Sequence, residues 1–228
     1  MSRATEQVYT ALRRRIMSGA YEPGRQLKEA HLAEELEVSR TPIRAALQRL
    51  VGDGLLTSSP GRGVFVAESN RWDIAEIFDL RLLLEGRAAE LAALRASAAQ
   101  IDTMRALTEQ MAALAAAKPT DYLQHLQNAN YRFHETLLAA ANAPRLERMA
   151  LDLAQVPILI GGFYLYAEAD MLRSVQHHRD LIMALEARDP DFAGNAIRVH
   201  LRTSYETIIR KRPDWSGVLP LTLPRDGG

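Results

Sequence analysis

The stretch LKEAHLAEELEVSRTPIRAALQRLVGDGLL, residues 27–56, decides the fold of the first part of the chain. Its second half predicts a helix that begins after Ser39 and ends near residue 53, with Ser39 or Thr41 as its cap. Pro42 stands in the first turn, where its missing N–H costs nothing. At about 100° per residue, one side of this helix is apolar and must face a core: Ile43, Ala46, Leu47 and Leu50.

Two further helices precede this one, and a hairpin follows it. Apolar residues at every fourth position predict a helix over 5–18, and a shorter helix is predicted over 28–37. After residue 53 the period changes to two, and the segments 55–58 and 64–66 flank a turn rich in Gly and Pro. Three helices followed by a β-hairpin are the order of a winged helix-turn-helix.

The rest of the chain is predicted to be helical, with no strand after Trp72. Periodicity predicts six helices, over residues 72–95, 99–117, 120–141, 143–167, 169–188 and 190–211. The fourth helix is expected to bend at Pro157 and at Gly161-Gly162. Together they would form an antiparallel bundle. The fold class is therefore mainly α, with a winged helix-turn-helix domain over 1–68, an all-helical domain over 72–212 and an irregular tail over 213–228.

Composition limits the class of protein. Apolar residues make up 47% of the 228 residues and charged residues 25%, and the lack of cysteine excludes disulfides and thiolate metal sites. We expect a cytoplasmic protein without membrane contact, because no secretory signal is visible and the apolar stretch 156–166 is too short for a bilayer. The net charge is zero, yet residues 1–66 carry 10 Lys and Arg against 7 Asp and Glu, a basic excess that suits a DNA-binding part.

The outer side of the helix after Ser39 carries polar and cationic residues: Arg40, Thr41, Arg44, Gln48 and Arg49. A recognition helix needs such a face near its N-terminus, because that end enters the major groove. There, arginine can read guanine bidentately or hold a phosphate. In the hairpin turn, Gly63 permits a close approach of the backbone to DNA, and Arg62 could reach a minor groove or a phosphate. By pattern alone, an ordinary solvated helix is the alternative.

These residues resemble the N-terminal domain of GntR-type regulators. The similarity runs from about Val8 to Val66 and includes Pro23-Gly24, the stretch quoted above and PGRGVFV at 60–66. It departs at Ala45, where the family usually has glutamate. The resemblance implies binding to double-stranded operator DNA. We expect a homodimer on a palindromic operator, because a two-fold symmetric protein binds two half-sites.

Three histidines fall on the inward sides of three predicted helices. His134 shares its face with Asn130, His178 is central to an apolar stripe, and His200 lies among small residues. Three imidazoles from three helices could bind one divalent metal ion through neutral nitrogen atoms. The alternative is three separate core histidines, each hydrogen-bonded to a carbonyl or to water.

The bundle resembles the FCD ligand-binding domain of the FadR subfamily, and six helices suit its VanR-like branch. The family's Asp-x-x-Phe-His corresponds to residues 130–134, and its later His-Arg and His-Leu pairs correspond to 178–179 and 200–201. The resemblance implies a site for a divalent metal, Zn²⁺ or Ni²⁺, whose ligands would be Asn130, His134, His178 and His200. Asparagine stands where the family has aspartate, and its neutral oxygen binds a divalent ion less tightly.

An open position on such a metal would accept a small carboxylate effector. Arg81, in the family's Arg-x-x-x-Glu pattern, is a candidate to bind that carboxylate, unless it only forms an ion pair with Glu85. We therefore interpret the sequence as a ligand-responsive transcription regulator and not as an enzyme. A repressor is expected, because repression relieved by a ligand is the commoner behaviour in the family. Two alternatives stay open: a metalloenzyme that uses the histidines, and an architectural DNA-binding protein whose bundle only dimerises.

Overall fold

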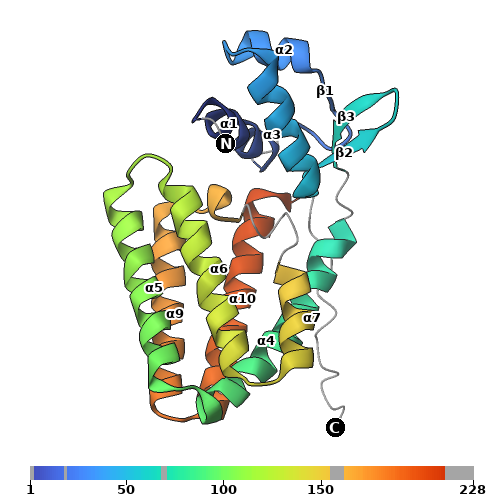
Figure 1. Cartoon of the computed structure of the whole chain (residues 1–228). Coiled ribbons are helices and arrows are strands. Elements are labelled where there is room, and N and C mark those ends of the chain that lie inside the picture. Colours follow the sequence, from blue (N-terminus) through green and yellow to red (C-terminus); the bar gives the residue numbers. More distant parts are fainter. Residues whose placement is uncertain (1–2, 18–19, 68–70, 155–161, 214–228) are drawn as a thin grey trace. The chain divides into compact units, whose positions relative to one another are not determined.

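The computed structural model describes residues 3–17, 20–67, 71–154 and 162–213. These residues divide into two compact units (Figure 1). The first unit contains the described residues up to Ala67 together with the short 3₁₀ helix η1 (Gly162–Leu165), and the second contains the remainder.

The first unit is a winged helix-turn-helix, as the sequence predicted. It consists of α1 (Arg3–Met17), β1 (Gln26–Leu27), α2 (Glu29–Glu35), α3 (Arg40–Gly52), β2 (Leu56–Ser59) and β3 (Gly63–Val66). The sheet is antiparallel in the order β1-β3-β2, and Ser59 pairs with Gly63 at the tip of the wing. Sequence analysis missed β1, because two residues are too short to show a period of two.

Apolar side chains of α1 and α3 form the core of this unit. The four apolar residues of α3 that were predicted to face the core are all buried, and Val8, Leu12 and Ile16 of α1 are buried as well. Ser39 is the N-cap residue of α3, but its side chain makes no capping hydrogen bond, so the predicted cap is present in position only.

Two glycines and one glutamine shape the wing. Gly61 and Gly63 have φ angles of 72° and 103°, which side chains with a Cβ rarely adopt. A Cβ on Gly63 would also lie 3.2 Å from Nε2 of Gln26. That Nε2 donates a hydrogen bond of 2.6 Å to the carbonyl oxygen of Arg62, which ties the wing to β1.

The second unit is entirely helical in its described residues. Its helices are α4 (Arg71–Arg95), α5 (Ala98–Ala117), α6 (Tyr122–Ala140), α7 (Pro144–Ala154), α9 (Glu168–Glu186) and α10 (Pro190–Lys211). The helix expected over 143–167 is instead represented by α7 and η1, and the bend expected at Pro157 and Gly161 lies outside the described residues. The tail beyond Pro213 also lies outside them.

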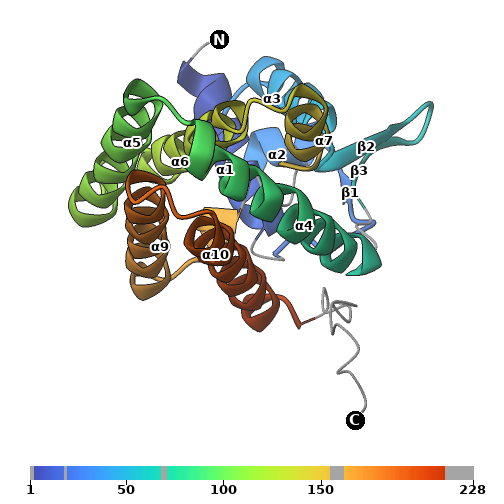
Figure 2. The same cartoon turned by 90° about the horizontal axis from the view of Figure 1, so that it is seen from below.

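Close helix packing surrounds the interior of this bundle. Helix α4 packs along α10, and α5 packs against α6 and α9 (Figure 2). Four alanines of α4 are completely buried, and their small side chains let neighbouring helices approach: Ala88, Ala89, Ala92 and Ala93.

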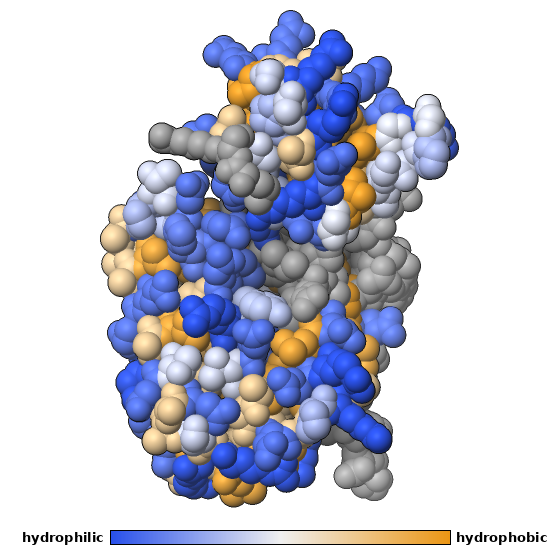
Figure 3. Space-filling view, in the orientation of Figure 1, coloured by the Kyte–Doolittle hydropathy of each residue, from blue (hydrophilic) through white to orange (hydrophobic). Residues whose placement is uncertain are grey.

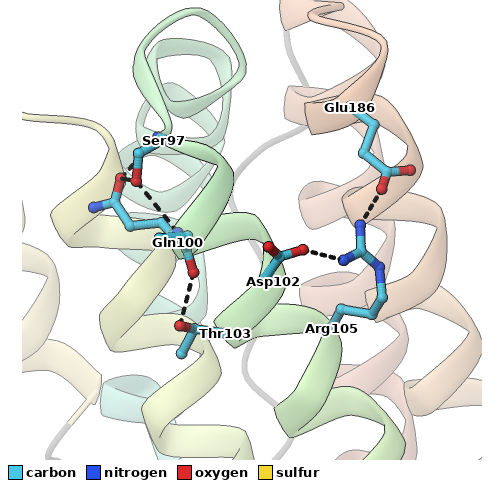
Figure 4. Close-up of polar contacts among 7 residues, drawn as sticks. Ser97, Gln100, Asp102, Thr103, Arg105 and Glu186 are labelled. Carbon is cyan, nitrogen blue, oxygen red and sulfur yellow. Dashed lines mark hydrogen bonds and ion pairs between the residues drawn. The ribbon is translucent and has the colours of Figure 1, made fainter.

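Polar contacts fix the helix ends. Ser97 and Gln100 form a reciprocal capping box at the start of α5, and Arg105 of α5 pairs with Asp102 and with Glu186 of α9 (Figure 4).

Hydrophilic residues cover much of the visible face of the molecule (Figure 3). Among the described helices, none combines the length and the apolar character that crossing a membrane requires.

Candidate metal centre and nucleic-acid interface

Three helices of the second unit bring three histidines together. His134 of α6, His178 of α9 and His200 of α10 are buried, and one ring nitrogen of each lies within 4.8 Å of those of the other two. The ring centroids are 4.5 Å apart for His178 and His200, 5.3 Å for His134 and His200, and 5.6 Å for His134 and His178. The inward-facing positions predicted on separate helices therefore meet at one level of the bundle.

A carboxylate of α4 orients the first of these rings. Oε2 of Glu85 lies 2.7 Å from Nδ1 of His134, and Oε1 accepts a 2.6 Å hydrogen bond from Nε of Arg81. Burial alone would raise the pKa of Glu85, but the charges of Arg81 and His134 and their hydrogen bonds lower it to about 2. An ionised carboxylate can only accept, so the proton of this hydrogen bond lies on Nδ1 of His134, and Nε2 is the nitrogen that could bind a metal ion.

The other two rings are neutral. Burial, followed by the charges of neighbouring groups, lowers the pKa of His178 and of His200 well below the usual value of a histidine. Phe133 stacks on His178 at a centroid distance of 4.0 Å, which holds that ring in place. Neutral imidazoles can offer lone pairs to a metal ion.

Several buried polar atoms of this cluster have no hydrogen-bond partner in the described structure: Nε2 of His134, both ring nitrogens of His178 and Nδ1 of His200. The same is true of Oδ1 of Asn130, one helical turn before His134 on α6. Leaving a buried polar atom unsatisfied costs about 1–3 kcal/mol, so a group of them calls for a ligand. Imidazole nitrogens and an amide oxygen form a donor set that suits a borderline divalent ion such as Zn²⁺ or Ni²⁺. The residues present thus fit a metal.

The remaining predicted residues of this site are placed as follows. Asn130 lies on α6 one helical turn before His134 and is half-buried. Arg81 is buried and forms the ion pair with Glu85 that the sequence offered as its alternative role. Sequence analysis missed Glu85 as the residue that orients His134. The available signal was the i,i+4 spacing from Arg81, which places both residues on one helix face.

The predicted DNA-binding residues lie on α3 and on the wing. On α3, Arg40, Thr41, Arg44 and Gln48 are exposed, and at the wing Arg62 and Gly63 are exposed. Arg44 forms a bidentate ion pair with Glu29 of α2, with bonds of 3.0 and 2.8 Å. To contact DNA, Arg44 would have to exchange this carboxylate for a phosphate or a base.

Arg49 has a different environment from the other predicted contacts. It is half-buried, pairs with Glu6 of α1 at 2.8 Å, and its guanidinium lies 3.7 Å from the ring centroid of Tyr9. Its position at the border of the apolar face brings it against α1. Arg49 therefore packs within the first unit, and its contact with DNA stays a prediction.

We expect Arg49→Ala to loosen α1. A partly exposed ion pair and a cation–π contact together contribute about 1 kcal/mol, so amides of α1 should exchange hydrogen roughly fivefold faster. Hydrogen exchange followed by mass spectrometry measures this rate. Gln48→Ala, an exposed neighbour on α3, is the control and should leave α1 unchanged. Equal exchange rates in Arg49→Ala and wild type would contradict the packing role.

Comparisons with known proteins assign both units to families. Residues 4–66 match the bacterial regulatory proteins of the gntR family, and residues 76–203 match the FCD domain. The chain is 30% identical to the HTH-type transcriptional regulator McbR of Escherichia coli over 82% of this chain and 84% of McbR. It is 25% identical to the galactonate operon transcriptional repressor of Escherichia coli over 88% of this chain and 94% of the relative.

Solved structures agree with this assignment. The structure of E. coli McbR/YncC covers 95% of this chain and all of its own, with a TM-score of 0.60 and 26% sequence identity. Both families and both relatives are transcription regulators, which confirms the expectation that this protein is not an enzyme. The chain is a DNA-binding transcription regulator of the GntR family with a C-terminal FCD domain.

Proposed function

We propose that this regulator is a metal-dependent sensor of a small carboxylate. His134, His178 and His200, with Asn130, would hold a divalent metal ion, Zn²⁺ or Ni²⁺, and the effector would occupy an open position on that ion. The observation that carries the proposal is the meeting of three buried imidazoles whose facing nitrogens have no partner in the described residues. FCD domains often bind metals, which supports it.

The charge of the donor set indicates the class of effector. Three neutral imidazoles and a neutral amide would leave the full charge of a divalent ion uncompensated, so an anionic ligand gains most by binding there. Arg81, which contacts Glu85 within the same polar cluster, is our candidate for a second contact to the carboxylate. The relative named for a galactonate operon suggests galactonate, a hydroxy acid, as the first effector to test.

Elemental analysis of the purified protein tests the metal part of this proposal. Protein prepared without an affinity tag should contain stoichiometric metal, and galactonate or a related acid should raise its Tm. Absence of metal, together with no stabilisation by any metal or carboxylate, would favour the alternative in which the bundle only dimerises.

Operator recognition is assigned to α3 and the wing. Arg40, Thr41, Arg44 and Gln48 would contact the major groove, while Arg62 and Gly63 would contact the adjacent backbone or minor groove. We infer that the protein acts as a cytoplasmic repressor, in line with the name of the galactonate operon relative.

We expect Arg40→Ala to weaken operator binding about tenfold and to reduce the salt dependence of binding by about one unit of slope. Arg40 is exposed at the first position of α3, so the fold should be unaffected. Fluorescence anisotropy with labelled operator at several salt concentrations measures both quantities. Arg14→Ala removes an arginine of α1 that is also exposed, and this variant should bind like wild type. Equal affinity for all three proteins would exclude Arg40 as a contact.

A homodimer is the assembly that we propose. Helices α4 and α10 share a groove lined by apolar, polar and cationic side chains: Leu82, Leu83, Asn195, Arg198, Val199, Arg202 and Thr203. Glu90 and Glu206 pair within the chain with the two arginines of the groove, Arg198 and Arg202, so the surface around the groove carries both signs of charge. A surface that carries both signs of charge can pair with a second copy of itself across a two-fold axis.

Helix α4 is the element through which we infer the coupling. Through Glu85 it contacts His134 of the metal centre, and through Leu83 it lines the proposed dimer groove. It is also the first helix after β3 along the chain. An effector that binds two arrangements of α4 with different affinities would therefore shift operator binding.

A further inference from the structure

His177 is a fourth histidine beside the three of the metal centre. Its ring centroid lies 6.0 Å from that of His200, with the two planes perpendicular. This separation is close to the 5.6 Å between His134 and His178. His177 is half-buried, and its Nδ1 is buried without a hydrogen-bond partner in the described residues.

The helix geometry places His177 at the border of the cluster. Consecutive residues of a helix point about 100° apart, so His177 cannot share the direction of His178. Only His134, His178 and His200 bring their donor atoms within 4.8 Å of one another among the described residues. His177 is thus near enough to contact a group bound by the cluster, although it is outside the set of donors.

A ligand would satisfy the unpaired nitrogen of this residue. A buried ring nitrogen without a partner is costly, and a hydrogen bond from a bound molecule would remove that cost. A carboxylate that binds a metal ion through one oxygen has a second oxygen available for a donor at its side. The proposed metal ligands include no carboxylate, because asparagine occupies position 130, and Glu85 is already paired with Arg81 and His134. An anionic ligand of the metal would therefore have to come from the effector.

We propose that His177 is an effector-binding residue, whose Nδ1–H donates a hydrogen bond to the carboxylate held at the metal of the histidine cluster. The inference rests on the proposed metal centre and adds to it a residue that reads the effector. His125 is exposed on α6 and faces away from the cluster, so replacing this histidine offers a matched control.

Cobalt-loaded protein allows the test without knowledge of the natural effector. Co²⁺ replaces the metal, its visible absorption reports the ligands, and acetate is the probe of carboxylate binding. We expect wild type, His177→Ala and His125→Ala to bind Co²⁺ equally. Acetate should bind His177→Ala about tenfold more weakly, the loss of one hydrogen bond to a charged group. His177→Gln, which keeps an N–H donor, should recover most of the affinity, and circular dichroism checks the fold of each variant.

The outcomes separate this inference from the function on which it rests. Equal acetate affinity in His177→Ala and wild type would overturn the effector role. Loss of Co²⁺ from His177→Ala would overturn it too, because His177 would then be a metal ligand. A cobalt protein whose spectrum ignores acetate would also overturn it, whereas failure of wild type to bind Co²⁺ would refute the metal centre itself.

Discussion

Replacing His178 with alanine is expected to lower the affinity for Zn²⁺ or Ni²⁺ by at least about 100-fold. Loss of a residue that only orients a ligand costs about 10–100-fold in metal affinity, and loss of one of three imidazole ligands should cost no less. His178 is completely buried at the centre of the cluster, with both ring nitrogens unpaired in the described structure. Competition with a chromophoric chelator measures the affinity.

Two further variants make this prediction specific. Glu85→Gln should reduce metal affinity by about tenfold, because His134 loses the charged acceptor that fixes its proton on Nδ1. His125→Ala removes an exposed histidine and should bind metal like wild type. If His178→Ala retains full metal affinity while it remains folded, the histidine cluster is not the metal site.

The second large effect is expected from Leu83→Glu in the proposed dimer groove. Leu83 of α4 is 55% exposed and lines the same groove as Val199, which is 54% exposed. Near a two-fold axis, the new carboxylates would be buried against apolar surface and brought close to each other, so the protein should become monomeric. A monomer loses the second half-site contact, and operator binding should fall by about 100-fold or more.

Sedimentation equilibrium and operator titration measure the two consequences separately. Leu172→Glu introduces the same charge at a leucine of α9 that is 51% exposed and lies outside the groove lining. This control should remain dimeric and should bind operator like wild type. A Leu83→Glu protein that stays dimeric would place the interface on another surface.

The helices and strands could be predicted from the sequence where a regular apolar pattern extended over many residues. The apolar side of α3 is an example, because Ile43, Ala46, Leu47 and Leu50 are all buried as periodicity required. The strand β1 has only two residues, and its pairing with β3 depends on a contact about 40 positions away, so no local pattern could reveal it. Arg49 shows the same limit for a side chain, since its contacts on Glu6 and Tyr9 come from another helix.

The metal centre was predictable only in part for a related reason. The apolar pattern predicted that His134, His178 and His200 lie on the inward faces of their helices. It gives no information on whether residues of different helices lie at the same height in the bundle. The resemblance to FCD domains supplied that alignment. Neither source indicated that Glu85 would fix the tautomer of His134, or that His177 would lie beside His200. The first contact follows from how α4 packs against α6, and the second from how α9 packs against α10.

Ligand binding in the histidine cluster is expected to control operator binding. The experiment titrates metal-loaded protein onto an operator selected from genomic fragments, with and without the carboxylate that stabilises the wild type. We expect the carboxylate to change the operator affinity of wild type, while His178→Ala binds the operator with the unliganded affinity and does not respond. A His178→Ala protein that responds to the carboxylate as wild type does would contradict it.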